Sequence, residues 1–356
     1  MSRLAGTIDG VIGVDPHRDT LAAAATDPVG GLLAQTSLRA DAAGYRRLLA
    51  FAQAQVPGRR CWAVEGAGSY GAGLTAFLQA QDERVVEVGR PKRPPRRTGA
   101  KSDALDAIRT AREALAHDHP LAPRSRGDRE ALRVLLATRH GACVAKVSAT
   151  NQLKAVIVGA PEELRAELRS LATQRQIARC ARLRDRPARS LEQRMTVRAL
   201  RSTAQRIQCL AVEAAGLRAE LERLVAAVAP WLLELPGVGP ISAAQVLVSW
   251  SHGGRLRSEA AFAALGGANP IPASSGQVTR HRLNRSGDRQ LNRALHTIVL
   301  ARLRDDPQTR ACAARRRAEG KSVREVRRCL KRTVARQLFK LLERYGGAAV
   351  EVAGVR

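Results

Sequence analysis

Apolar runs and helix-like patterns alternate over the first hundred residues of the chain. Three short apolar runs come first, and the turn sequence DPVGG between the second and the third indicates a hairpin. Two segments with helical spacing follow, and each leads to another apolar run. The predicted strands cover residues 11–15, 20–26, 32–38, 61–65 and 84–89, and the predicted helices cover residues 41–55 and 69–81.

The resulting order of elements, β-β-β-α-β-α-β, is that of the ribonuclease H type of fold. Actin-like and sugar-kinase domains share this order, so topology alone does not choose between them. A kinase-like domain needs a glycine-rich phosphate loop after its first strand. The segment that begins at Asp15, DPHRDT, has no glycine, which counts against a kinase.

A polar helical region extends from residue 128 to about residue 228. Its clearest feature is a series of apolar and small residues spaced alternately three and four positions apart, which is typical of a coiled-coil seam. Either one helical hairpin packs on itself within the chain, or the seam is an arm for dimerisation. The seam positions are Leu200, Thr203, Ile207, Leu210, Ala214, Leu217, Leu221 and Leu224.

The segment PGVGP, with Gly237 and Gly239, lies between two further helical patterns. It resembles a helix-hairpin-helix, in which glycines let backbone N–H groups approach a DNA phosphate at a helix N-terminus. An ordinary turn between helices is the alternative. We therefore expect an α/β domain followed by all-α segments. The expected segments are a ribonuclease H-like domain (1–127), a helical coiled-coil region (128–229), a domain with the helix-hairpin-helix (230–318), and a basic C-terminal helix and tail (319–356).

The formal net charge of +28 indicates a polyanionic partner, with nucleic acid ahead of an anionic membrane surface. No stretch of about eighteen apolar residues predicts a membrane span, and the N-terminal segment lacks the apolar core of a secretory signal. The six cysteines are scattered without metal-ligand spacing. We therefore expect reduced thiols in a cytoplasmic protein.

The densest positive run of the chain leads directly into two carboxylates, Asp103 and Asp106. They suit the first turn of a helix, where they offset its dipole. They also suit a divalent metal beside a phosphate that the cations attract. The cations expected to contact nucleic acid here are Arg90, Lys92, Arg93, Arg96, Arg97 and Lys101.

Two other carboxylates, Asp15 and Glu65, end the first and the fourth predicted strands. Those strands are neighbours in the predicted sheet, so the two side chains should lie side by side. Asp103 and Asp106 share one helix face, because residues three apart are neighbours there. Four acids at one place would repel one another unless two Mg²⁺ ions offset their charge. Each acid alone has an ordinary structural explanation.

A second dense stretch places Ser274 and Ser275 before Gly276 and a series of arginines. One interpretation is a flexible loop beside a DNA-binding surface. The other is a serine nucleophile that attacks phosphorus, with the arginines holding the phosphate. Asp288 is positioned to cap the helix that follows. The arginines are Arg280, Arg282, Arg285, Arg289 and Arg293.

Five motifs in this order resemble the transposases of the IS-one-ten family of insertion sequences over almost the whole chain. IGVDPHRDT, VEGAGSYG and KSDALDA match the family's RuvC-like Asp-Glu-Asp-Asp tetrad, which gives Asp15, Glu65, Asp103 and Asp106 here. LPGVGPISA and the segment NPIPASSG, with the arginines after it, match its C-terminal transposase domain.

The resemblance implies that the tetrad binds Mg²⁺ and that a serine joins covalently to DNA. That serine is Ser275, directly before Gly276, with Ser274 as the neighbouring alternative. It also implies a structured guide RNA from the element's own end, which pairs with donor and target DNA. It further implies dimers that pair into tetramers, with the tetrad of one subunit facing the serine of another, in a bacterial, nucleoid-associated protein.

Three hypotheses follow. The leading one is a recombinase that cuts and rejoins DNA through a phosphoserine, assisted by the tetrad and Mg²⁺. The second is a metal-dependent junction nuclease that hydrolyses DNA with activated water. The third is a basic DNA- or RNA-binding protein without catalysis, in which replacing Asp15 or Asp106 would leave every activity intact.

Overall fold

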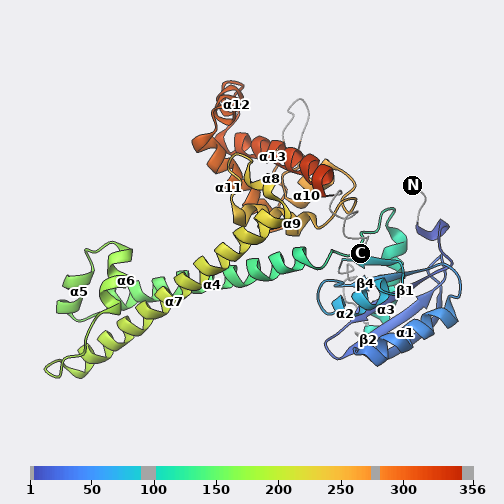
Figure 1. The fold of residues 1–356 in the computed structure, drawn as a ribbon, viewed down its shortest axis with the longest axis horizontal. Helices are drawn as coiled ribbons and strands as arrows, with labels where there is room; N and C mark the ends of the chain where they lie inside the picture. Colours follow the sequence, from blue (N-terminus) through green and yellow to red (C-terminus); the bar gives the residue numbers. More distant parts are fainter. Residues whose placement is uncertain (1–3, 90–101, 274–280, 347–356) are drawn as a thin grey trace. The chain divides into compact units, whose positions relative to one another are not determined.

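The computed structural model of the chain describes residues 4–89, 102–273 and 281–346. It divides into two compact units, residues 1–125 and residues 126–356 (Figure 1). The first is mixed α/β, and the second is almost entirely helical. None of the helices in the described ranges combines the length and the apolar character needed to cross a bilayer.

The first unit is built on a five-stranded sheet with the order β3-β2-β1-β4-β5. β1 pairs antiparallel with β2 and parallel with β4, so the first and the fourth strands are neighbours, as predicted. The observed element order is also the predicted one. After a 3-10 turn at Leu4–Gly6, the elements are β1 (Gly10–Pro16), β2 (Thr20–Thr26), β3 (Leu32–Arg39), α1 (Ala42–Gln55), β4 (Arg60–Glu65), α2 (Ala72–Gln79), β5 (Val85–Val88) and α3 (Asp103–Ala116).

The two faces of this sheet carry separate apolar cores, because successive side chains of a strand point to opposite faces. Ile12 and Val14 of β1 pack with residues of α1 and α2, such as Leu48 and Leu74. Val11 lies on the other face, in a core that includes residues of α3. Both β1 and β4 are buried along most of their length, so they form the centre of the unit.

Close contact between α3 and β1 depends on Gly13. A Cβ atom at Gly13 would lie 2.1 Å from the carbonyl oxygen of Ala107 and 2.6 Å from the amide nitrogen of Ala111. Those distances are far below van der Waals contact, so only glycine lets the helix backbone approach the strand this closely. Gly13 therefore sets the distance between the helix that begins at Asp103 and the strand that carries Asp15.

The second unit contains two long helices, α4 (Asp128–Val158) and α7 (Leu191–Val228), which pack along each other (Figure 1). α5 (Glu162–Leu168) and α6 (Thr173–Ala181) connect them and share a small apolar core with both. Leu200, Thr203 and Ile207 of the predicted seam are buried on α7. The seam therefore packs at least in part within this chain, and the coiled coil and its role in dimerisation stay predictions.

The remaining helices form the main core of the second unit, together with the ends of α4 and α7. α9 and α11 pack against each other, and α13 contacts both α10 and α11. The basic helix expected after residue 319 is observed as α13. The elements are α8 (Pro230–Leu233), α9 (Pro240–Trp250), α10 (Glu259–Leu265), β6 (Ile271–Pro272), β7 (His281–Arg282), α11 (Arg289–Asp305), α12 (Pro307–Ala318) and α13 (Val323–Gly346).

The PGVGP segment forms the turn between α8 and α9, and its two glycines have different surroundings. Gly237 has a positive φ of 73°, and a Cβ atom there would lie 2.9 Å from the carbonyl oxygen of Ile298 on α11. The backbone conformation and the packing within the unit therefore explain why residue 237 is a glycine. Gly239 precedes α9 as its N-cap and has open space around it. A contact of either glycine with DNA stays a prediction.

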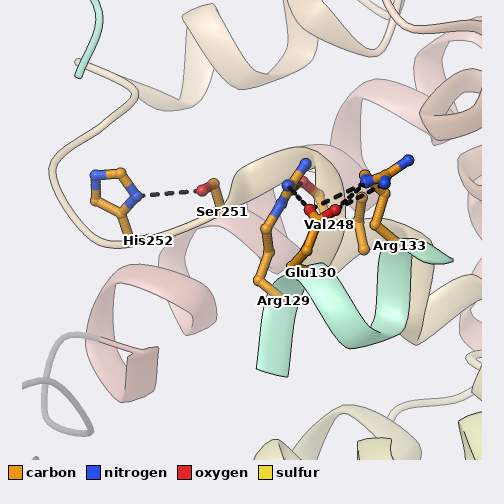
Figure 2. Close-up of polar contacts among 6 residues, drawn as sticks. All are labelled: Arg129, Glu130, Arg133, Val248, Ser251 and His252. Atoms are coloured by element: carbon orange, nitrogen blue, oxygen red, sulfur yellow. Dashed lines mark hydrogen bonds and ion pairs between the residues drawn. The ribbon is translucent and has the colours of Figure 1, made fainter. Parts of the chain in front are cut away.

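A polar network joins the first turn of α4 to the end of α9 (Figure 2). The Nε of buried Arg129 donates to the carbonyl oxygen of Val248 at 3.2 Å, and its Nη1 donates to Glu130 at 3.0 Å. Arg133 also donates to Glu130, and this hydrogen bond lowers the pKa of the Glu130 carboxyl. Beyond α9, the Ser251 Oγ lies 3.2 Å from Nδ1 of His252.

Candidate functional site

Three side chains from two segments meet beside the carboxyl end of β1. Nε2 of His17 lies 3.5 Å from Oδ2 of Asp15 and 3.3 Å from Oδ1 of Asp103. One possible metal-ligand atom from each residue lies within 4.8 Å of the other two. Asp15 is buried, His17 is half-buried and Asp103 is exposed, so this Asp15–His17–Asp103 cluster reaches from the core to the surface.

The local sequence explains why these residues meet. Asp15 lies near the end of β1, and the His17 N–H donates to the Thr20 carbonyl at 2.8 Å, which closes the turn into β2. Asp103 is the first residue of α3, after the N-cap Ser102. Because α3 packs on the face of β1 that carries Gly13, its first turn lies beside Asp15, two residues further along the same face.

Glu65 lies at the end of β4, on the same face of the sheet as Asp15. The last aligned pair of the two parallel strands is Val14 with Val64, and Asp15 and Glu65 each come one residue later. Both side chains therefore point to the face that α3 covers. Glu65 is half-buried, but it is not a member of the three-residue cluster among the described residues.

Asp106 lies one helical turn after Asp103 and is buried. Its Oδ1 accepts a hydrogen bond from Nη1 of Arg109 at 2.8 Å. Both aspartates are in the first turn of α3, as the helix-dipole interpretation requires, and that interpretation is compatible with a metal site. Two predicted acids, Asp15 and Asp103, thus meet at His17. The roles of Glu65 and Asp106 as ligands stay predictions.

The Asp15–His17–Asp103 cluster fits a divalent cation. Nε2 of His17 is buried and makes no hydrogen bond within the described ranges, although it faces two carboxylates. A cation there would offset the repulsion between the carboxylates and give the nitrogen a partner. Carboxylate oxygens suit Mg²⁺ or Mn²⁺, whereas an imidazole nitrogen is more typical of iron or zinc sites. The donor set therefore does not select Mg²⁺.

No role for His17 was predicted from the sequence. The available signal was its position two residues after Asp15, since residues two apart in an extended segment share a face. Its place after Pro16, in the turn into β2, is equally typical of a residue with a structural role. Its proximity to Asp103 depends on the packing of α3, which sequence spacing does not reveal.

Four of the arginines predicted to hold a phosphate lie in the described part of the second unit, and their side chains are available to a ligand. Arg282, Arg285, Arg289 and Arg293 are exposed, and none forms an ion pair with another described residue. The predicted residues that lie outside the described ranges are Arg90, Lys92, Arg93, Arg96, Arg97, Lys101, Ser274, Ser275 and Arg280.

The predicted helix cap at Asp288 is confirmed. Its Oδ1 accepts hydrogen bonds from the N–H groups of Gln290 and Leu291 at 2.8 and 3.1 Å. Its Oδ2 accepts a hydrogen bond from the Ser249 Oγ at 2.7 Å. The start of α11, which carries Arg289 and Arg293, is thereby joined to α9.

Two protein families match separate parts of the chain. Residues 12–162 match a transposase family, the DEDD transposases of IS110. Residues 229–314 match the family described as Transposase IS116/IS110/IS902. The first match contains Asp15, Glu65, Asp103 and Asp106, and the second contains Ser275 and the arginines after it.

The chain is also similar to the insertion element IS110 uncharacterized 43.6 kDa protein of Streptomyces coelicolor. It is 33% identical over 130 residues, which cover 36% of this chain. The match spans 32% of the relative's own length.

Proposed function

Because the chain belongs to the IS116/IS110/IS902 family of transposases, we propose that it is a DNA recombinase that moves an insertion sequence. Its reaction is the cutting and rejoining of DNA strands. The observation that carries this proposal is the meeting of Asp15, His17 and Asp103 at one point. That point lies in the segment matched by the DEDD transposase family.

Asp15 and Asp103 hold a divalent metal, Mg²⁺ in the cell, and Glu65 and Asp106 complete the acidic tetrad. When bound, the metal supplies positive charge that stabilises the developing charge on a phosphodiester. The protein's own part is to fix the acids. β1 holds Asp15, the close packing at Gly13 holds the start of α3, and Arg109 orients the carboxylate of Asp106.

The covalent step belongs to Ser275. Its Oγ attacks phosphorus, loses its proton and forms a phosphoserine bond, while the bond to the 3′ oxygen breaks and that oxygen leaves as a hydroxyl. Rejoining is the reverse: a 3′-hydroxyl attacks the phosphoserine and releases the serine. Support comes from the family match over residues 229–314 and from the exposed arginines at 282, 285, 289 and 293, which suit phosphate.

The partners in this proposal are donor DNA, target DNA and a structured guide RNA from the end of the element. The net charge of +28 supports polyanionic partners without distinguishing DNA from RNA. The basic run from Arg90 to Lys101 contacts the nucleic-acid backbone. The turn with Gly237 and Gly239 acts as a helix-hairpin-helix contact to DNA.

We also propose that the protein acts as a dimer that pairs into a tetramer. The seam on α7 then extends its packing to a second copy in addition to α4. Exposed apolar side chains on these two helices, at Val144, Val147 and Val212, support an interface there.

A strand-cleavage assay tests the proposal at the acids. The protein is incubated with Mg²⁺, the element-end RNA and labelled donor and target DNA, and the cut strands are quantified. Asp103→Asn should reduce cutting by more than about a hundredfold. The loss of a residue that only supports a metal ligand typically costs about ten- to a hundredfold, and the loss of the ligand itself should cost more. The matched control is Asp19→Asn, because Asp19 is an exposed residue of the same unit that pairs only with Arg18 among described side chains.

The alternatives give other results in the same assay. Unchanged cutting by Asp103→Asn, with the metal still required, would contradict the role of the cluster. A protein that binds DNA and RNA but does not cut with any divalent metal would be a binding protein rather than a recombinase. Cutting that survives in Ser275→Ala would indicate a nuclease.

A further inference from the structure

A cleft of about 400 Å³ lies in the second unit, outside the acidic cluster. One wall is formed by residues 267–270 and by the strand β7 with the residues after it, 281–284. The other wall is formed by the end of α12 and by one face of α13. Both walls belong to one compact unit, so the cleft is a feature of a single packed body.

The lining of this cleft is strongly basic. Among the described residues, six arginine or lysine side chains line it, against a single carboxylate, that of Glu325. Pockets for small organic ligands are mostly apolar and aromatic, which does not describe this lining. An excess of guanidinium groups suits phosphate, which arginine binds through paired hydrogen bonds. The six cations are Arg282, Arg316, Lys321, Arg328, Arg332 and Arg336.

The acids near the cleft are already bound to other groups. Glu325 accepts hydrogen bonds from the Ser322 hydroxyl at 2.6 Å and from the Ser322 N–H at 2.9 Å, and these bonds lower the pKa of its carboxyl. It therefore acts chiefly as part of the cap of α13 and lies 3.7 Å from Arg328. Glu319 accepts from Arg316 at 2.8 Å and lies 3.7 Å from Lys321.

Two of the arginines that line the cleft, Arg332 and Arg336, are held in place by a carboxylate. Glu259, the first residue of α10, accepts hydrogen bonds from Arg332 at 3.2 Å and from Arg336 at 3.0 Å. One carboxylate thus orients two guanidinium groups and neutralises only one of them. Arginines that are fixed before a ligand arrives lose less conformational entropy on binding it.

The opposite wall is fixed by side-chain amides. Nδ2 of buried Asn284 donates to Oδ1 of Asn269 at 2.6 Å, and Oδ1 of Asn284 accepts from Ser286 Oγ at 2.6 Å. These bonds join the residues before β6 to those after β7. β6 and β7 pair with each other, and the sequence between them contains Ser275.

We propose that this cleft binds the phosphodiester backbone of the DNA strand on which the enzyme acts. Lys321 and Arg328 on the α13 side, with Arg282 on the β7 side, contact successive phosphates, and Arg332 and Arg336 supply fixed charge. The choice of DNA as the ligand rests on the proposed function. The cleft adds α12 and α13 to the surface predicted to contact nucleic acid, in addition to the basic run at 90–101, the turn with Gly237 and Gly239, and the arginines at 280–293.

Binding of a short fluorescein-labelled single-stranded DNA, followed by fluorescence anisotropy between about 50 and 200 mM salt, tests this inference. The variant combines Lys321→Gln with Arg328→Gln. Each lost phosphate contact on a single strand reduces the slope of log affinity against log salt by about 0.7. We therefore expect a slope smaller by about 1.4 and an affinity about tenfold weaker.

The matched control combines Arg317→Gln with Arg324→Gln, which removes two exposed arginines of the same helices that do not line the cleft. It should bind with the wild-type slope. Equal slopes for the cleft variant and the control would overturn the proposal, provided that both variants melt like the wild type.

A parallel titration with RNA of the same sequence distinguishes the two nucleic acids. Loss of RNA binding alone would overturn the assignment to DNA. The strand-cleavage assay reports separately on the proposed function. A wild type that never cuts, but whose cleft variant shows the smaller DNA slope, would refute the recombinase and leave the cleft as a DNA site.

Discussion

Nε2 of His17 lies 3.3 Å from Oδ1 of Asp103, which joins the turn after the first strand to the first turn of α3. The same nitrogen lies 3.5 Å from Oδ2 of Asp15. An imidazole between two carboxylates is a different donor set from four carboxylates alone. It makes His17 a candidate metal ligand or a residue that positions the two acids.

Replacing His17 should weaken metal binding. His17→Ala removes the nitrogen that faces both carboxylates, and we expect the affinity for Mn²⁺ or Mg²⁺ to fall by about ten- to a hundredfold. Isothermal titration with each metal measures this directly. His117→Ala is the control, because His117 is an exposed histidine directly after α3, the helix that carries Asp103, and pairs with Glu113. An affinity unchanged in His17→Ala would show that the imidazole takes no part in binding.

Gly13 should tolerate no larger residue. In Gly13→Ala the new methyl group would meet the Ala107 carbonyl oxygen, so α3 must shift. Overpacking of this kind costs about 1–3 kcal/mol of unfolding free energy. Urea denaturation measures the loss, and Gly68→Ala, in the same unit, is the control because a Cβ there meets nothing within 4 Å. Equal stability of the two variants would contradict the packing argument.

The sheet of the first unit was predictable because its signals are local. Each apolar run is bounded by turn residues, and the order of runs and helical patterns reproduces the observed order of elements. Adjacency of β1 and β4 followed from the fold class, which placed Asp15 beside Glu65. The cap at Asp288 followed from the preference of aspartate for helix N-termini.

Other features depend on contacts that spacing along the chain does not encode. The approach of His17 to Asp103 follows from the packing of α3 on Gly13. The cleft joins residues near 270 and 282 with α13, which are far apart along the chain. Gly237 was assigned to DNA from its motif, whereas its positive φ and its contact with α11 already require glycine.

The cysteines should differ in reactivity with a thiol reagent. Burial raises the pKa of Cys61 and of Cys180 to about 11, whereas Cys209 is exposed. Because the thiolate is the reactive form, Cys61 and Cys180 should stay unmodified at neutral pH in the folded protein. Mass spectrometry after N-ethylmaleimide treatment identifies the modified sites, and denaturant should expose all six. Rapid native modification of Cys61 would contradict its burial.

Acid should destabilise the second unit through His252. Burial, and then the charge of Arg255, lowers the pKa of this imidazole in the folded state, while Glu343 opposes the shift and Arg129 adds to it. The unfolded chain therefore takes up the proton first as the pH falls through about 6.5, and the free energy of unfolding decreases. His252→Asn should make Tm less dependent on pH between about 7.5 and 5.5. Parallel Tm curves for variant and wild type would exclude this role.

Formation of a covalent protein–DNA adduct is the decisive test of a serine nucleophile at Ser275. The protein is incubated with Mg²⁺, the element-end RNA and labelled donor and target DNA, then denatured and separated by size. We expect a labelled adduct that is absent in Ser275→Ala, retained in Ser274→Ala and greatly reduced in Asp15→Asn. Cut DNA without any adduct, or an adduct that persists in Ser275→Ala, would contradict it.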